Sequence, residues 1–166
     1  MIPSYELDNN AIHKFQSARR RATMERILAF LRNRSADLLC FEQVRDRLVA
    51  RTSKKLGIQE IPLGAIVGSV QRCSDYTRDF MPLKDSDQRR WTRVMAAAAE
   101  ALDLPPIRAY RLGDVYFVAD GHHRVSVARQ RGLDHITAIV TEVQTRKVLD
   151  STTITHTPRS LLPWRA

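Results

Sequence analysis

One continuous stretch, residues 115–132, constrains the fold more than any other part of this sequence. It reads Val-Tyr-Phe-Val-Ala-Asp-Gly-His-His-Arg-Val-Ser-Val-Ala-Arg-Gln-Arg-Gly. The apolar run 115–119 predicts a short buried strand, and Asp120-Gly121 predicts a turn. A helix is expected to begin at His122 and to end before Gly132, a glycine placed as a C′ residue. The helix start therefore lies directly at the end of a buried strand.

The residues at this turn favour the binding of an anion. A helix start carries the positive end of the helix dipole and N–H groups without internal partners, so phosphate is the natural ligand for Gly121, His122, His123 and Arg124. We expect His123 and Arg124 to hold the anion, and Asp120 to cap the turn or to bind Mg²⁺ carried by a nucleotide. The alternatives are a core histidine at 122 and a plain turn residue at Asp120. Adjacent histidines diverge by about 100° on a helix, so no protein metal site is predicted.

This turn and the helix after it resemble the ParB/sulfiredoxin superfamily, in which a Gly-x-x-Arg turn before a helix holds nucleotide phosphates. Residues 60–63, 70–72 and 135–143 resemble the first strand, a Gln-x-Arg-type loop and a later strand of that domain, so the likeness covers about 56–143. It implies a domain at 57–143. The superfamily includes chromosome-partitioning clamps that bind CTP, sulfinic acid reductases, a free-serine kinase and proteins labelled nucleases.

The loop 68–80 is rich in groups that do chemistry, with seven of them inside nine positions: Gln71, Arg72, Ser74, Asp75, Tyr76, Arg78 and Asp79. The resemblance implies that this loop faces the Gly-x-x-Arg turn across a nucleotide site. Arg72 and Asp75 are then the candidates for contacts to phosphate and to ribose or metal. The alternative is a surface loop in which Arg and Asp pair with each other.

The two cysteines, Cys40 and Cys73, lack metal-type spacing, and the simplest interpretation is a reduced, cytoplasmic protein. Sulfiredoxins carry their nucleophilic cysteine inside the glycine turn, where this chain has His122. That departure argues against sulfinic acid reductase chemistry, because nothing marks Cys73 as an activated nucleophile.

The N-terminal third predicts a basic helical extension, residues 1–56. Apolar residues at helical spacing indicate one helix over 11–33 and a second from 38 to about 55, ended by Gly57, so the two form a helical hairpin. Residues 1–56 hold 12 Lys and Arg against 6 Asp and Glu, which is most of the net charge of +9. Arg19, Arg20 and Arg21 are candidates for contacts to nucleic acid; the alternative is a helical pair that covers one side of a sheet.

The remaining elements complete an α+β fold. They are a strand within 58–67, a third helix within 82–103 that Ser86 or Asp87 can cap, a hairpin of 107–112 with 115–119, and a strand over 134–143. Residues 144–166 predict an extended tail, in which Trp164 would pack on the domain or on a second subunit. No apolar run approaches the roughly 18 residues that span a bilayer.

Two functions remain open at this stage. The first is a nucleotide-binding protein that holds CTP, ATP or ADP with Mg²⁺ at residues 121–124 and that either hydrolyses it, transfers its phosphoryl group or only binds it. Asp120 and His123 are then the candidate catalytic groups. The second is a DNA-binding regulator or nuclease that uses the same pocket for a backbone phosphate. A homodimer is compatible with both functions.

Overall fold

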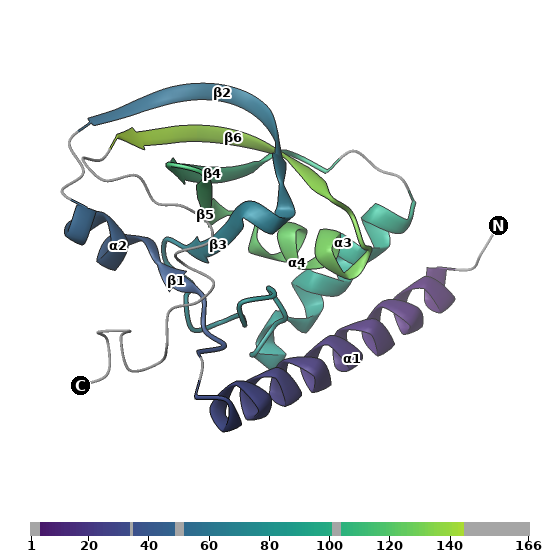
Figure 1. Ribbon diagram of the computed structural model, residues 1–166. Helices are drawn as coiled ribbons and strands as arrows, with labels where there is room; N and C mark the ends of the chain where they lie inside the picture. The colour runs from purple at the N-terminus through teal and green to yellow at the C-terminus, as the bar shows by residue number, and fades with distance from the viewer. Residues whose placement is uncertain (1–3, 34, 49–51, 101–103, 145–166) are drawn as a thin grey trace.

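The computed structural model describes residues 4–33, 35–48, 52–100 and 104–144 (Figure 1). Six strands form one mixed sheet in the order β1-β3-β5-β4-β6-β2. The strands are β1 (Leu39–Cys40), β2 (Thr52–Pro62), β3 (Ile66–Ser69), β4 (Ile107–Leu112), β5 (Val115–Asp120) and β6 (His135–Gln144). The helices are α1 (Ser4–Leu31), α2 (Phe41–Leu48), α3 (Gln88–Ala99) and α4 (His122–Gln130). The predicted α+β class is confirmed.

The strand, turn and helix of residues 115–132 form as predicted. Val115, Phe117 and Val118 are buried in β5, and Gly121 then adopts a left-handed conformation with φ of 95° that turns the chain into α4. At the other end Gly132 has φ of 70° and donates its N–H to the carbonyl of Arg129, which ends the helix. The two glycines thus fix both ends of α4.

Three of the described helices, α4, α3 and α1, lie in successive layers over the sheet. Val125 of α4 packs into the main core with residues of β3, β4, β5 and β6, whereas Val127 packs with α3 and α1. The Trp91 indole of α3 donates to Ser126 Oγ of α4 at 2.8 Å, and Phe15 of α1 meets the Trp91 ring edge-on at 5.6 Å. The long helix α1 is therefore attached to the sheet through α3 (Figure 1).

The second predicted helix is wrong in its length and its packing. Helix α2 ends at Leu48, and 52–62 form strand β2, which pairs with β6 from Thr52 opposite Gln144 to Pro62 opposite His135. Gly57, expected to end a helix, marks an irregularity in this pairing and has φ of 84°. Pairing with a ten-residue strand satisfies the backbone donors and acceptors of this segment better than a helix ending in solvent.

The predicted hairpin of the first two helices is also corrected. Helix α1 packs on α3, whereas α2 lies apart from both, beside β1 (Figure 1). Phe41 at the start of α2 stacks on Tyr110 at 4.9 Å and meets Phe117 at 5.5 Å on the sheet. Strand β1 and the first five residues of β2 precede residue 57, where the sequence placed the start of the domain. The predicted tail, with Trp164, lies outside the described residues.

The two cysteines are paired, contrary to the expectation of free thiols. Strand β1 runs parallel to β3 with Cys40 opposite Ser69, and Cys73 follows Ser69 by four residues. The Cα atoms of Cys40 and Cys73 are 5.5 Å apart, within the range of bridged cysteines, and their sulfur atoms are joined in a disulfide. The spacing in sequence could not reveal this, because the pairing of β1 with β3 creates the contact.

Among the described helices, none has the length and apolar character required to cross a bilayer.

Candidate functional site

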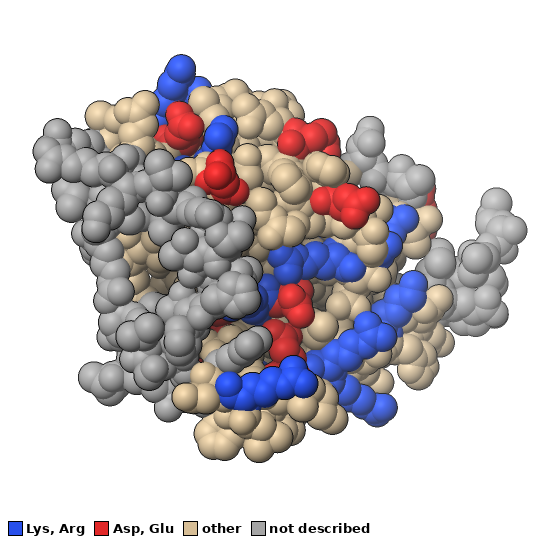
Figure 2. Space-filling view, viewed as in Figure 1, with Lys and Arg blue, Asp and Glu red and all other residues tan. Residues whose placement is uncertain are grey.

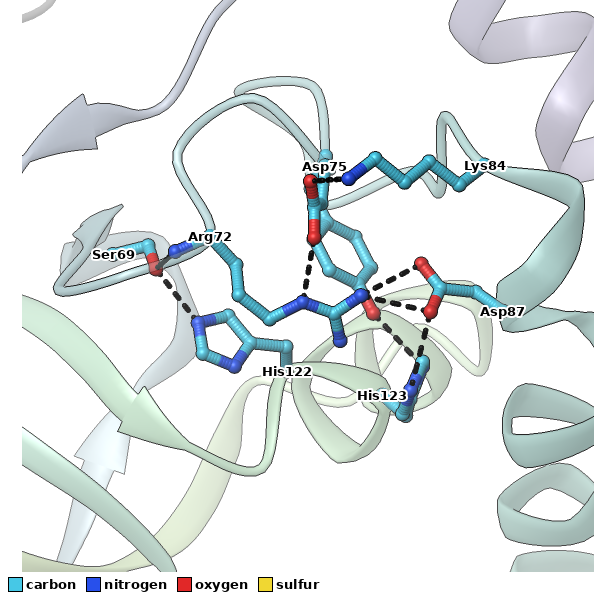
Figure 3. A network of polar contacts seen from close by, with 8 residues as sticks. Ser69, Arg72, Asp75, Lys84, Asp87, His122 and His123 are labelled. Atoms are coloured by element: carbon cyan, nitrogen blue, oxygen red, sulfur yellow. Dashed lines mark hydrogen bonds and ion pairs between the residues drawn. The ribbon is translucent and has the colours of Figure 1, made fainter.

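The candidate site lies where the loop after β3 meets the start of α4. Strands β3 and β5 are parallel neighbours, so the chain leaves both of them at the same edge of the sheet. Figure 3 shows the Arg72 guanidinium between Asp75 and Asp87, with His122 and His123 projecting from the first turn of α4. The short turn Asp85–Asp87 (η2), which leads into α3, supplies Asp87.

Arg72 is the centre of the polar network. Its Nε donates to Asp75 Oδ2 at 2.7 Å, and its Nη2 contacts both oxygens of Asp87 at 2.8 and 3.0 Å. Burial lowers the pKa of Arg72, but the hydrogen bonds to Asp87 and Asp75 outweigh burial and leave the pKa raised. Burial also favours the neutral form of Asp75 and so raises its pKa, but the interactions with Lys84 and Arg72 outweigh burial and leave the pKa lowered. The pairing of Arg72 with Asp75 was one of the alternatives open in the sequence.

His122 is a neutral, buried histidine. Its Nε2 lies 2.7 Å from Ser69 Oγ, and the same hydroxyl accepts the backbone N–H of Arg72 at 2.8 Å. Since the Ser69 oxygen accepts from Arg72, the hydroxyl hydrogen is available to donate to His122 Nε2. Burial, with Arg72 and His123 nearby, lowers the pKa of His122 to about 4. His122 therefore positions the loop after β3 against α4.

His123 has one ring nitrogen that is hydrogen-bonded and one that makes no hydrogen bond to a described residue. Its Nδ1 lies 2.8 Å from the Tyr76 hydroxyl, whose pKa is raised by burial and by Asp87, so the phenol stays protonated and donates to Nδ1. The imidazole proton of neutral His123 then resides on Nε2. That atom is buried, makes no hydrogen bond to a residue that the structure describes and lies 3.7 Å from Asp87 Oδ1. Burial lowers the pKa of His123, and Asp87 opposes this effect.

The start of α4 itself is uncapped. Gly121 is the N-cap residue and has no side chain to cap the helix, and no side chain of the described residues accepts a hydrogen bond from the first-turn N–H groups. A glycine also fits because an added Cβ would lie 2.6 Å from Ile107 Cγ2 and 3.0 Å from Arg124 Cζ. The arrangement offers N–H donors at the positive end of a helix, beside the free donor of His123.

The structure does not bring Arg124 and Asp120 into this network. Arg124 donates through Nη1 to the carbonyls of Pro105 and Pro106, the latter at 2.8 Å, and through Nη2 to Asp120 at 2.7 Å. The side chain of Asp120 is 65% exposed. Arg124 therefore holds the segment before β4, and the structure brings together Arg72, Asp75, His122, His123 and the helix start at Gly121.

The basic run of α1 is split between two roles. Arg19 donates through Nε to Asp85 Oδ1 at 2.9 Å and through Nη1 to the Leu83 carbonyl, which fastens α1 to the turn before α3. Arg20 and Arg21 are exposed on α1.

Sequence reasoning missed three residues of the network, Ser69, Lys84 and Asp87. Asp87 was expected at most to cap a helix; it is the N-cap residue of α3, yet its carboxylate makes no capping bond and binds Arg72 instead. A carboxylate just before a helix was the available signal, but its partner lies 15 residues away. Among the described residues, no group of three or more His, Cys, Asp or Glu could hold a metal ion.

Comparisons with known proteins place most of the chain in one family. The family model described as ParB N-terminal domain matches residues 49–156. Among solved structures, sulfiredoxin from Arabidopsis thaliana is similar, with 20% sequence identity and a TM-score of 0.38 over 60% of this chain and 93% of that one. No curated protein matches the chain.

Proposed function

Because this chain belongs to the ParB N-terminal domain family, we propose that it binds the phosphate groups of a nucleotide at the first turn of α4. The observation that carries the proposal is the Nε2 atom of His123, which is buried, holds the imidazole proton and makes no hydrogen bond to a described residue, since Asp87 Oδ1 lies 3.7 Å away. A buried donor without a partner costs about 1–3 kcal/mol, so the folded protein gains free energy when a ligand oxygen accepts from it.

The surroundings of His123 suit a phosphate oxygen. The uncapped first turn of α4 offers backbone N–H donors, and Arg72 supplies a guanidinium close to the same place. Both histidines are neutral at pH 7, since their pKa values are lowered by burial, and they therefore contribute hydrogen bonds and not charge. The ligand is thus held by oriented donors in a half-buried site.

Magnesium has a defined role in this proposal. Arg72 and Lys84 are balanced by Asp75 and Asp87, so an incoming phosphate meets the carboxylate of Asp87. A Mg²⁺ ion carried by the nucleotide offsets this repulsion and can take Asp87 as one of its oxygen ligands. We therefore expect tighter binding with Mg²⁺ than without it.

The test is a thermal-shift and calorimetry series with CTP, ATP, ADP and GTP, with and without Mg²⁺. The wild type is expected to be stabilised by one of these nucleotides, and His123→Ala to bind it about 10- to 150-fold more weakly, the equivalent of about 1.5–3 kcal/mol for a hydrogen bond to a charged group. His123→Gln is the matched variant, because its amide N–H2 can take the place of Nε2–H; it should retain part of the affinity. Product analysis of the same samples reports hydrolysis or phosphoryl transfer.

Arg124→Ala separates this site from the one expected from the sequence. Since Arg124 is bonded to Pro105, Pro106 and Asp120, its removal should lower the melting temperature and leave the nucleotide-induced shift in place. The proposal is wrong if no nucleotide stabilises the wild type. It is also wrong if Arg124→Ala abolishes the shift and His123→Ala does not.

A further inference from the structure

A groove runs between α1 and α3, beside the turn η2 that supplies Asp87 to the network around Arg72. It consists of two hollows of about 620 and 440 Å³, and both are lined by Asp85 and Gln88, so the two adjoin. The first is lined further by Ile12, Ser86, Arg89, Thr92, Arg93 and Ala96, and the second by Phe15, Gln16, Arg19, Arg20 and Thr23. Helix α1 lies outside the residues that match the family model, so the groove is a feature of this chain's own N-terminal helix.

The groove is strongly basic. Arg19 is paired with Asp85, which removes one charge of each sign from the lining. The remaining charged residues of the lining are Arg20, Arg89 and Arg93, all three exposed, and none of them forms an ion pair with another described residue. The lining therefore has a net charge of three, all from guanidinium groups. Figure 2 shows Lys and Arg side chains gathered along α1 on the face in view.

The positions of the arginines suit a chain of phosphates. Arg89 and Arg93 are four residues apart on α3, so they lie on one face and are separated by about 6 Å along the helix axis. Arg20 approaches from α1 on the opposite wall. Two cations on one wall and one on the other can contact successive phosphates of a strand that lies along the groove.

The other side chains in the lining match a nucleic-acid backbone better than a lipid surface. Gln16, Ser86 and Gln88 offer neutral hydrogen-bond donors, the kind that contacts phosphate and sugar oxygens beside arginine. A bilayer would require apolar side chains beside the cations. The exposed apolar residues of α1 do not line the groove; they are Met24, Ile27, Leu28, Phe30 and Leu31.

We propose that the groove between α1 and α3 binds the sugar-phosphate backbone of a nucleic acid through Arg20, Arg89 and Arg93. The lining has no exposed aromatic ring for base stacking, because Phe15 is only 1% exposed. The groove consequently binds the sugar-phosphate backbone of the nucleic acid and does not distinguish its bases. This proposal does not depend on nucleotide binding at α4.

The test is fluorescence anisotropy with a labelled single strand and a labelled duplex of mixed sequence, from 50 to 200 mM salt. The wild type is expected to bind one or both with an affinity that falls steeply with salt. The triple variant Arg20→Gln, Arg89→Gln, Arg93→Gln should reduce the slope of log affinity against log salt by about 2–3, since each lost phosphate contact contributes roughly 0.7–0.9.

The matched control is the triple variant Arg21→Gln, Arg26→Gln, Arg108→Gln. It removes the same charge from three exposed arginines that do not line the groove, and it should keep most of the slope and affinity. An equal loss in both triple variants would overturn the proposal, because net charge alone would then explain binding. Binding to vesicles that contain phosphatidylserine but to neither oligonucleotide would also overturn it. Circular dichroism of both variants shows that the fold is intact.

Discussion

Gly121 allows the chain to pass from β5 into α4 within one residue. Its φ of 95° would strain any residue that carries a side chain, and an added Cβ would lie 2.6 Å from Ile107 Cγ2. We predict that Gly121→Ala lowers the free energy of unfolding by at least about 2–3 kcal/mol, since backbone strain and overpacking combine. Urea denaturation of the variant measures this change.

Two other glycines serve as controls for that measurement. Gly132 has φ of 70° but open space around its missing Cβ, so Gly132→Ala should cost only the backbone strain of about 1–2 kcal/mol. Gly64 has open space and no positive φ, and Gly64→Ala should change stability by less than about 1 kcal/mol. If all three substitutions cost the same, the close contact at Gly121 is not what selects glycine there.

His122 makes stability depend on pH. Its pKa is lowered from 6.5 to about 4 by burial, so between these values the unfolded chain binds a proton that the folded chain does not. The contribution of His122 is complete above pH 6.5 and is lost as pH falls toward 4, by at most about 3 kcal/mol at 1.36 kcal/mol per pH unit. His123 acts in the same direction because its pKa is also lowered.

Glu25 on α1 acts in the opposite direction over part of this range. Burial, with Asp79 nearby, raises its pKa from 4.5 to about 6, so the folded state gains stability from Glu25 as pH falls from 6 to 4.5. We predict a shallower loss of stability on acidification for His122→Gln than for the wild type, and a steeper loss for Glu25→Gln. Unfolding free energies at pH 4.5, 5.5, 6.5 and 7.5 measure both slopes; equal slopes in all three proteins would contradict the assignment.

At the scale of elements, α1 is an integral layer of the fold. Phe15 is 1% exposed and packs on Trp91, and Ala11, Ala18 and Ala22 are buried on the same face. We predict that Phe15→Ala costs about 3–5 kcal/mol, because it leaves a cavity between α1 and α3. Leu31→Ala, at a residue 72% exposed on the same helix, should cost less than about 1 kcal/mol. Comparable losses in chemical denaturation would mean that α1 is not docked by this face.

The elements that could be predicted from the sequence are those with local causes. The passage from β5 through Gly121 to α4 depends on residues within 18 positions, and the helix predicted over 11–33, which the structure has as Ser4–Leu31, depends on one helix face. Strand β2 was predicted in part as helix because its partner β6 begins more than 70 residues later. Spacing within one segment contains no information about such a partner.

The candidate site divides in the same way. The helix start at 121–123 could be read from the sequence because it directly follows a glycine, whereas the direction of the Arg124 side chain could not. Arg124 donates to the carbonyls of Pro105 and Pro106, and nothing in the sequence indicates that these carbonyls lie beside it. The bond from Arg72 to Asp87 likewise depends on how the loop after β3 lies against η2.

At the scale of the whole molecule, the disulfide closes a loop that reaches both edges of the sheet. Cys40 lies in β1 at one edge, and the chain between Cys40 and Cys73 includes β2 at the other edge. In the chain-entropy model a closed loop of this size, with a sequence separation of 33, stabilises the fold by about 3–4 kcal/mol. We predict that a reductant lowers the free energy of unfolding by up to this amount.

The double variant Cys40→Ser, Cys73→Ser separates loop closure from other effects of the reductant, because it should resemble the reduced wild type and show no response to dithiothreitol. Alkylation of the native, unreduced protein followed by intact mass measurement gives the state of the two thiols directly. No added alkyl group is expected, since both sulfur atoms are joined. Two alkyl groups would restore the expectation from the sequence, and the contact between β1 and the loop of Arg72 would then depend on strand pairing with β3 alone.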